Sequence, residues 1–384
     1  MNFLFFISTL IENSHIIQTI QFFIFYIKSK VEFRGIEKYL EQCKDINIKI
    51  IQAFDKNENP KISIISPVFN SNKYILRLLK SIQNQNFINI EIIFINDCSE
   101  DNSIEIIKEY QNYDKRTELI NNKINKGTFI TRNLGALYAK GKYLILPDPD
   151  DMISKNILQT CFKLAEKHDY DIIKFNVYLG KGRLSFHEIY RNLINKKIYY
   201  PNLSTYIYYG NNELEIIDYY LCNKFIKKAA FINAINYLSL YYLNRFIIFS
   251  EDSMMNYIIF RNAKSFYYLN KIGYYYLNNY LSITKNLFKK SHIRIEMIFI
   301  YLKIVFEYSK NNKYEKDMAN FLFTNFNTRF NIPNRILDFN EDYLFYYEII
   351  NQYLNNKFLK DENKYFLVNL LNILLKRNEE IKKH

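Results

Sequence analysis

The chain has 384 residues, of which 49% are hydrophobic and 24% are charged. This composition is typical of a globular protein and excludes a disordered tail, a collagen and a polytopic membrane protein. The length allows one large domain or two ordinary ones.

The net charge of +13 would by itself suggest a nucleic acid or an anionic membrane as partner. The chain also has 35 Tyr and 32 Phe but only eight Gly, and Ile, Asn and Lys are plentiful throughout. These abundant residues have A- and T-rich codons, so a genomic bias explains the lysine excess without any partner. The basic residues form no block longer than pairs such as Lys289-Lys290. We therefore expect no nucleic-acid partner.

The four cysteines, Cys43, Cys98, Cys161 and Cys222, lie far apart, and no pair has the spacing of metal ligands. Isolated cysteines are most often small buried apolar residues, so we expect reduced thiols and a cytoplasmic protein. The five histidines are equally dispersed, which argues against a zinc enzyme.

The N-terminal residues 1–27 are mostly apolar, but the polar residues 12–15 divide them into two halves. Neither half reaches the roughly 18–20 apolar residues that a membrane-spanning helix needs. The segment also lacks the basic start and the small-residue cleavage site of a secretory signal. We expect a helix that packs on the domain or makes a peripheral membrane contact through residues 1–30. If it did span, Lys28, Lys30 and Arg34 would hold the rest of the chain in the cytoplasm.

Residues 1–59 are predicted to form an N-terminal helical segment that ends at the polar, proline-containing stretch 55–60. After it, short apolar β-branched runs alternate with segments of helical periodicity, which predicts βαβ units and a mostly parallel sheet flanked by helices. The predicted strands are 62–66, 90–95, 118–120 and 143–146, and the predicted helices are 74–82, 103–110, 128–139 and one that starts near 154. The α/β domain is expected to cover residues 60–285, and amphipathic helices such as 298–308 and 343–353 predict a C-terminal helical extension over 286–384.

In such a sheet the loops after successive parallel strands gather at one edge, where ligands of open α/β sheets bind. Asn70, Asp97 and the segment Asp148–Asp151 are therefore predicted to converge. Three of the eight glycines, Gly127, Gly135 and Gly141, lie just before that segment and suggest a close backbone approach.

The segment Asp148-Pro-Asp-Asp151 places three carboxylates in four residues directly after an apolar strand. A hard dication such as Mg²⁺ or Mn²⁺ would relieve their repulsion. The alternative is a solvated turn whose acids lie near the start of the next helix. Arg132 is similarly open: it could contact a phosphate or base, or it could form a structural ion pair.

Several ordered motifs carry a resemblance to a known family. They are Ile64–Asn70, Leu79–Gln85, Glu91–Ser99 with Asp101, Asn125–Gly127, Thr131–Asn133 with Gly135, Ala139–Tyr143 and Leu146–Asp151, and more weakly Asn223–Phe225, Glu251-Asp252 and Gly273–Tyr276 with Leu281–Thr284. Together they resemble the family 2 glycosyltransferases, inverting enzymes with the glycosyltransferase A (GT-A) nucleotide-sugar fold.

The resemblance implies roles for individual residues. Pro67 and Asn70 would line the nucleotide pocket, and Asp97 would bind the uracil ring of a UDP-sugar. Asp148 would bind the ribose, and Asp150, with Asp148 and Asp151 as further candidates, would hold Mn²⁺ or Mg²⁺. Asp252, with Glu251 beside it, would be the catalytic base.

The Glu251-Asp252 pair also has a simpler explanation, since Ser250 could cap a helix whose first turn favours acids. The Tyr-rich stretches 206–209, 241–242 and 274–276 could stack on acceptor sugars, but ordinary amphipathic packing is the favoured interpretation.

The sequence departs from the family pattern at four positions. Asn96 replaces an acid, Cys98 replaces a glycine, Leu277 replaces an arginine and Pro147 replaces a common Leu or Asp.

The predicted function is a metal-assisted hexosyl transfer from a UDP-sugar to an acceptor hydroxyl on a glycan, lipid or protein. The departures keep open a catalytically inactive nucleotide-sugar-binding or scaffold protein. A metal-dependent nucleotidyltransferase is a third hypothesis, weakened by the missing Gly-rich loop after the first strand.

Overall fold

The computed structural model describes residues 55–56, 58–179, 220–238, 247, 251–277, 300 and 304, and the backbone of two short strands at 184–185 and 197–199. The proposed membrane contact at residues 1–30, most of segments 1–59 and 286–384, and the Tyr-rich stretches 206–209 and 241–242 lie outside this part. The predicted domain boundaries therefore stay predictions. Ile300 and Ile304 are buried helical positions within the helix predicted at 298–308.

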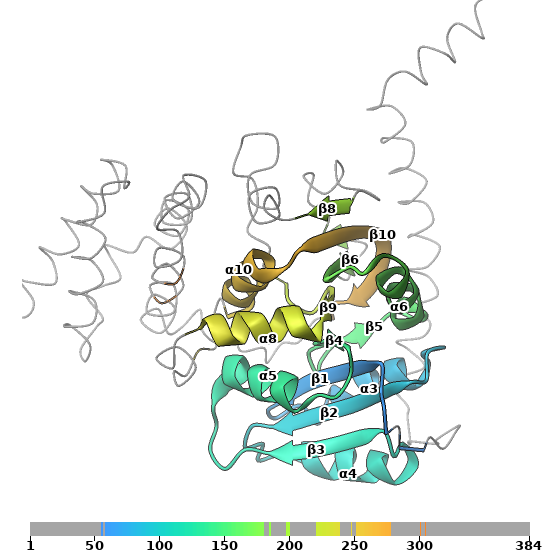
Figure 1. Cartoon of the computed structure of the whole chain (residues 1–384). Helices are drawn as coiled ribbons and strands as arrows, with labels where there is room; N and C mark the ends of the chain where they lie inside the picture. Colours follow the sequence, from blue (N-terminus) through green and yellow to red (C-terminus); the bar gives the residue numbers. More distant parts are fainter. Residues whose placement is uncertain are drawn as a thin grey trace, which may run out of the picture.

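The described strands form one sheet of ten strands in the order β3-β2-β1-β4-β9-β6-β10-β5, with β7 paired to β6 and β8 paired to β10 (Figure 1). Their bounds are β1 Ile62–Val68, β2 Ile90–Asn96, β3 Thr117–Asn121, β4 Tyr143–Ile145, β5 Met152–Ile153, β6 Ile172–Tyr178, β7 Leu184–Ser185, β8 Lys197–Tyr199, β9 Lys224–Lys227 and β10 Ser265–Tyr275.

The first half of the sheet is parallel, as the alternation of strands and helices predicts. β1 lies between β2 and β4 and is parallel to both, and β2 is parallel to β3. Beyond β4 the sheet is mixed, because β9 runs antiparallel to both β4 and β6, while β10 is parallel to β6. The expected parallel arrangement thus holds from β3 to β4 and gives way to a mixed sheet on the other side.

Six helices are described, and they lie on both faces of the sheet (Figure 1). Their bounds are α3 Ile75–Gln83, α4 Ser103–Tyr113, α5 Gly127–Tyr138, α6 Ile157–His168, α8 Lys228–Tyr237 and α10 Glu251–Asn262. Helices α5, α8 and α10 contact one another and form one layer.

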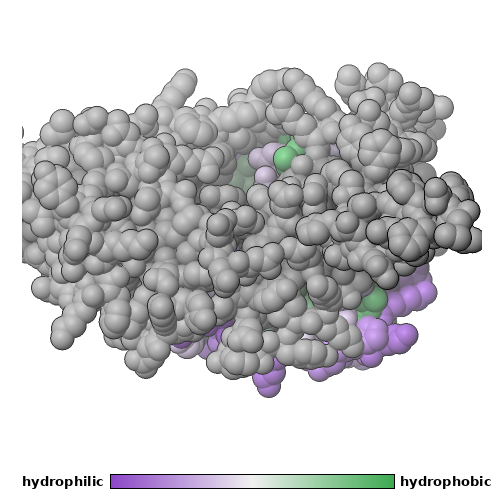
Figure 2. Space-filling view, turned by 90° about the horizontal axis from the view of Figure 1, so that it is seen from above, coloured by the Kyte–Doolittle hydropathy of each residue, from purple (hydrophilic) through white to green (hydrophobic). Residues whose placement is uncertain are grey.

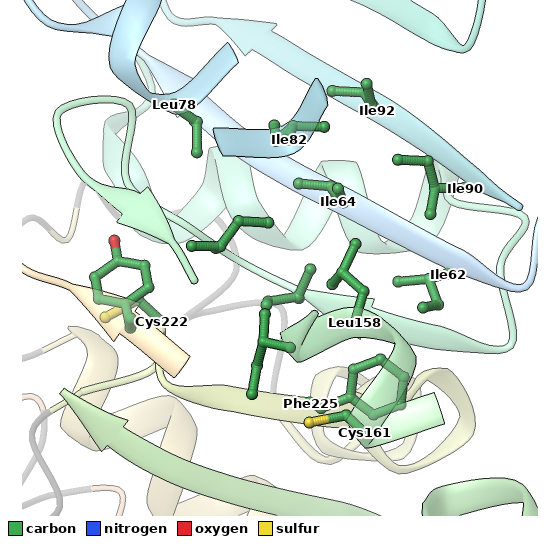
Figure 3. Packing of buried hydrophobic residues seen from close by; sticks show 14 of the residues in the cluster. Ile62, Ile64, Leu78, Ile82, Ile90, Ile92, Leu158, Cys161, Cys222 and Phe225 are labelled. Atoms are coloured by element: carbon green, nitrogen blue, oxygen red, sulfur yellow. The ribbon is translucent and has the colours of Figure 1, made fainter. Parts of the chain in front are cut away.

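Alternation along β1 explains how both faces are covered. Successive side chains of a strand point to opposite faces of its sheet. Ile64 belongs to the core cluster that also contains Leu78 and Ile82 of α3, and Figure 3 shows these side chains facing one another. Ile65, the next residue, meets α5 instead. Strands that are buried on both faces read as continuous apolar runs, as the sequence Ile92–Ile95 of β2 does.

Close contact between α5 and the sheet depends on Gly135. A Cβ atom built at this position would lie 2.4 Å from Cγ2 of Ile65 and 2.7 Å from Cδ1 of Ile95. Both distances are too short for carbon atoms, so only glycine lets the helix lie this near to β1 and β2. The glycine cluster seen in the sequence therefore marks helix–sheet contact at this position.

Part of the surface of the described residues is visible from above. In the space-filling view of Figure 2, the described residues that reach the surface at the lower edge are mainly hydrophilic. No helix within the described ranges has both the length and the apolar character that crossing a membrane requires.

Of the cysteines, Cys98, Cys161 and Cys222 are free thiols, as expected, and Cys43 lies outside the described residues.

The close approach of α5 gives a first prediction. Gly135→Ala should destabilise the protein by about 1–3 kcal/mol, because the added methyl group overpacks the contact with Ile65 and Ile95. The control is Leu137→Ala on the same helix, whose side chain is 52% exposed and whose loss should change stability by no more than about 0.5 kcal/mol. Urea denaturation measures both, and equal midpoints for the two variants would contradict the packing argument.

Candidate functional site

The carboxyl ends of the first three strands lie in one row. Val68 of β1 is opposite Asn96 of β2, which is opposite Asn121 of β3. The loops that follow are joined by main-chain hydrogen bonds, from Asp97 N–H to the Val68 carbonyl (2.8 Å) and from Asn122 N–H to the Asn96 carbonyl (2.9 Å). The predicted convergence of Asn70 and Asp97 at one sheet edge is thereby confirmed.

Asp97 is buried and holds the start of α5. Its Oδ1 accepts hydrogen bonds from Lys126 N–H and Asn122 Nδ2 (both 2.8 Å), and its Oδ2 accepts one from Gly127 N–H (2.8 Å). A carboxylate is favourable at a helix N-terminus, where unpaired N–H groups and the helix dipole meet. Both oxygens thus bind the chain itself, and the contact of Asp97 with a uracil ring stays a prediction.

The loops after β1 and β2 are fastened to each other through Asn70. Its N–H donates to Ser99 Oγ (3.1 Å), and its Oδ1 accepts from Glu100 N–H (2.8 Å). Asn70 is exposed, whereas Pro67 is buried within β1. Asn70 therefore faces the surface at the predicted nucleotide edge, and Pro67 lies beneath it in the sheet.

Cys98 occupies a backbone conformation that favours glycine. Its φ angle is +65°, in the left-handed region, and its thiol donates to the Asn122 carbonyl at 3.4 Å. A side chain in this region costs on the order of 1 kcal/mol. The departure from glycine seen in the sequence is thus accommodated with strain.

The three carboxylates of the acidic loop after β4 have different surroundings and different partners. Asp151 is buried, with Oδ2 accepting from the Tyr274 hydroxyl and Oδ1 from Leu277 N–H (both 2.7 Å). Burial, followed by repulsion from Asp150 and Asp148, raises the pKa of Asp151 well above its usual value. Asp151 therefore ties the loop to β10 and to the residues just after it.

Asp148 and Asp150 are the more accessible acids of this loop. Both side chains are partly exposed. Asp148 accepts from Arg132 Nη2 at 2.5 Å, and its N–H donates to the Tyr274 hydroxyl (3.0 Å). The main-chain carbonyl of Asp150 accepts from Arg77 Nη2 (2.9 Å). The Asp150 carboxylate is therefore the better candidate for a bound cation than that of Asp151.

Arg132 lies at the centre of the site and is 4% exposed. Its Nη2 binds Asp148, and its Nη1 lies 2.5 Å from Asp252 Oδ1 and 3.3 Å from Glu251 Oε1. Burial alone would lower the pKa of Arg132, but Asp252, Asp148 and Glu251 raise it well above its usual value. Of the two alternatives left open by the sequence, the described contacts are those of a structural ion pair.

One donor of this guanidinium is left over. The buried Nε–H of Arg132 finds no hydrogen-bond partner in the described part of the chain. An unsatisfied buried donor costs about 1–3 kcal/mol, and such exceptions in native structures often mark functional sites. Arg132 is therefore placed so that its Nη atoms bind the carboxylates, while its own Nε–H stays unsatisfied by the residues that the structure describes.

Glu251 and Asp252 form the first turn of α10. Glu251 Oε1 accepts from the Thr128 hydroxyl (2.9 Å), and Asp252 Oδ2 accepts from Leu221 N–H (3.3 Å). Burial, the largest cause, raises the pKa of Asp252 to about 7; Glu251 and Asp148 act in the same direction and Arg132 opposes them. A carboxylate with this pKa exchanges protons near neutral pH, as a general base must.

The site has more negative than positive charge. Three carboxylates, those of Asp148, Glu251 and Asp252, contact the guanidinium of Arg132, and those of Asp150 and Asp151 lie in the same loop as Asp148. Within the described residues no set of three or more His, Cys, Asp or Glu side chains is placed to hold a metal ion. Mg²⁺ and Mn²⁺ often take only one or two carboxylates and complete their shell with water and phosphate. Asp148 and Asp150 fit that kind of site.

Sequence reasoning missed the role of Tyr274. Its hydroxyl lies between two residues of the acidic loop, donating to Asp151 and accepting from Asp148 N–H. The neighbouring Tyr276 is only partly buried, and its ring lies 6.3 Å from that of Tyr220. Burial, followed by Asp151, Asp148 and Asp150, raises the pKa of Tyr276, so its hydroxyl lies near the acidic loop. The sequence signal that could have found Tyr274 is a hydroxyl-bearing side chain within a strand whose pattern otherwise favours burial.

The Tyr274 hydroxyl gives a second prediction. Tyr274→Phe should destabilise the protein by about 1–3 kcal/mol, because the buried Asp151 carboxylate loses a donor. The control is Tyr143→Phe, which removes a hydroxyl that donates to the exposed Glu166 (2.9 Å) and should cost clearly less. Urea denaturation compares them, and a larger loss in the Tyr143 variant would refute the role given to Tyr274.

Comparison with known proteins bears on the whole site. Residues 63–233 match the family model of glycosyl transferase family 2. Glycosyltransferase GlyG of Streptococcus pneumoniae is 32% identical over 117 residues, which are 30% of this chain and 39% of the relative. The minor teichoic acid biosynthesis protein GgaB of Bacillus subtilis is 33% identical over 183 residues, which are 47% of this chain and 19% of the relative. The chain thus spans well under two thirds of these relatives.

The fold has a counterpart among solved structures. The structure of Staphylococcus aureus TarS 1–349 in complex with UDP-GlcNAc superposes with a TM-score of 0.61 at 16% identity, covering 84% of this chain and 91% of that one. The similarity supports the GT-A-like architecture that the sequence motifs imply. Residues 63–233 are thus the part through which the chain is similar to glycosyl transferase family 2.

Proposed function

We propose that the protein transfers a sugar from a nucleoside diphosphate, UDP in the first instance, to an acceptor hydroxyl with inversion at the sugar. The observation that carries the proposal is the meeting of Asp148 and Asp252, 104 positions apart in sequence, on the two Nη atoms of one buried arginine. The family match and the UDP-GlcNAc complex of the TarS fragment support the choice of a nucleotide sugar.

In this proposal Asp252 is the general base. A single displacement at the sugar needs a group that removes the proton of the attacking hydroxyl, and a base whose pKa is near the working pH is the most effective. Asp252 has a pKa of about 7 and is held in place by Arg132 and by Leu221 N–H. Glu251, held by Thr128, raises the pKa of Asp252 by its charge.

The donor would bind at the edge formed by the loops after β1, β2 and β4. Asn70 and Pro67 would line the nucleotide pocket, Asp97 would contact the base, and Asp148 would contact the ribose. Asp148 and Asp150 would hold Mn²⁺ or Mg²⁺, which when bound neutralises charge on the departing diphosphate. Asp151 would keep the loop in shape through Tyr274 and Leu277.

A binding protein without catalysis is the second candidate. Asn96, where the family pattern has an acid, favours it: its amide donates to Asn121 Oδ1 (3.0 Å), and its Oδ1 accepts from Ser99 N–H (2.9 Å). Both candidates bind a nucleotide sugar, but only the enzyme turns it over. Release of UDP from a panel of UDP-sugars distinguishes them and identifies the donor sugar.

The proposed cation site gives a third prediction. Asp150→Asn should lose the stabilisation that UDP with Mn²⁺ gives the wild type, which is about 2.7 kcal/mol at a hundred times the Kd. The control is Asp169→Asn, the same change of charge at a residue that is 75% exposed and precedes β6 at the opposite sheet edge. Thermal unfolding with and without ligand measures both. Full Mn²⁺-dependent stabilisation of the Asp150 variant would remove this residue from the metal site.

The proposed base gives a fourth prediction. Asp252→Asn should bind UDP with Mn²⁺ as the wild type does but transfer sugar at least 10²-fold more slowly, since general-base catalysis contributes about 10²–10⁴. In the wild type, kcat/KM should rise about tenfold per pH unit below pH 7 and level off above it, because Asp252 must be ionised to act.

The fold of the Asp252 variant can be checked by the sign of its pH dependence. The raised pKa of Asp252 means that the fold disfavours the ionised form, so the wild type loses stability as pH rises through about 7. Asp252→Asn lacks that titration, so its unfolding temperature should fall less than that of the wild type as pH rises through about 7. A variant that transfers sugar at the wild-type rate would show that Asp252 is not the base.

A further inference from the structure

We propose that Arg132 is a positioning residue. It fixes Asp252, the proposed general base, relative to Asp148, which lies on the donor side of the site. The proposal rests on the function proposed above and goes beyond it, because it assigns the buried arginine to catalysis through its effect on two other residues. The starting observation is that Arg132 Nη1 binds Asp252 Oδ1 and Arg132 Nη2 binds Asp148 Oδ1.

The two acids come from parts of the fold that are anchored independently. Asp148 follows β4, and its loop is tied to β10 through Tyr274. Asp252 begins α10, which packs against α8 and α5. Arg132 lies between them on α5, which is fixed to the sheet by Gly135 and to the β2 loop by Asp97. Arg132 therefore joins both acids to α5, a helix that is itself held by the sheet and by Asp97.

Guanidinium chemistry suits this task. The group is planar and rigid, and its two Nη atoms direct hydrogen bonds to separate acceptors at fixed angles. Lysine offers a single nitrogen on a flexible stem, so it could hold one acid but would not fix two in a common frame. The substitution Arg132→Lys therefore keeps the charge and removes the geometry.

Thr128 supports the same arrangement one helical turn earlier. Its hydroxyl binds Glu251 Oε1, which also lies 3.3 Å from Arg132 Nη1. The first turn of α10 is thus held by two side chains of α5 that lie four positions apart, the spacing that places residues on one helix face. Among the described residues the Nε–H of Arg132 has no hydrogen-bond partner, which fits this interpretation, since a purely structural arginine would be placed where its own donors are satisfied.

The chain contains a matched control in Arg116. It is also 4% exposed, and its Nε and Nη2 bind Asp114 Oδ1 (2.8 Å) and Oδ2 (2.7 Å). Asp114 and Arg116 lie between α4 and the start of β3, at the sheet end opposite to the site. Arg116→Lys therefore weakens a buried ion pair of comparable kind without touching the proposed catalytic groups.

The experiment compares Arg132→Lys and Arg116→Lys in the full chain, using UDP release with acceptor to obtain kcat and KM, and thermal shift to follow binding of UDP with Mn²⁺. We expect Arg132→Lys to lower kcat about 10²-fold, the effect of a misplacement near 1 Å. The KM for the donor and the binding of UDP should change by less than about fivefold. Arg116→Lys should lower the unfolding temperature and leave kcat within about twofold of the wild type.

Rescue and a second variant complete the test. Guanidinium at millimolar concentration should restore part of kcat to Arg132→Ala and none to Arg132→Lys, whose ammonium fills the space. If Arg132→Lys does not fold, Thr128→Val decides, with an expected three- to tenfold loss in kcat at unchanged UDP binding. Wild-type kcat in Arg132→Lys, or in Thr128→Val when that variant decides, overturns the proposal. A wild type that binds UDP but never releases it from a sugar donor refutes the proposed function instead.

Discussion

One buried guanidinium surrounded by three carboxylates is the interaction on which the site depends. Asp148, Glu251 and Asp252 would repel one another strongly in a partly buried setting, and Arg132 offsets that repulsion only in part. Burial, followed by this remaining negative charge, raises the pKa values of Asp151 and Asp252. The same excess makes the edge of the sheet attractive to a dication, so the protonation and metal chemistry proposed for it have a common origin.

The rest of the fold provides the positions for this charge cluster. Parallel strands β1, β2 and β3 bring three loops to one edge in register, and the mixed half of the sheet adds β10, which supplies Tyr274. Helix α5 is held close to the strands because Gly135 has no side chain. The anchors are made of ordinary packing and of hydrogen bonds such as that from the Tyr274 hydroxyl to Asp151, whereas Asp148, Glu251 and Asp252 carry like charges that repel one another. Residues such as Asp151 and Tyr274 thus stabilise the loops, and Asp148 in the same acidic loop is left for the proposed function.

The sequence predicted much of this arrangement, and its limits have physical reasons. Strands β1 to β4 were predictable because they are short apolar runs between clear turns, and their parallel order placed Asn70 and Asp97 together. β9 and β10 escaped because Lys and Tyr in them interrupt the apolar pattern. The partners of Arg132 could not be read at all, since Asp252 is 120 positions away and a charge pattern does not say which acid an arginine meets. The three acids of the β4 loop look alike in sequence, and only tertiary contacts separate the buried Asp151 from Asp148 and Asp150.

The hydrogen bond from Leu277 N–H to Asp151 has an evolutionary consequence. The donor is a backbone amide, which nineteen of the twenty standard residues carry and proline alone lacks. Drift at this position can therefore exchange one side chain for another while the anchoring of the acidic loop survives. The leucine that stands where related proteins are expected to carry arginine is compatible with an intact loop, and a comparison that weighs side chains alone would mistake it for damage.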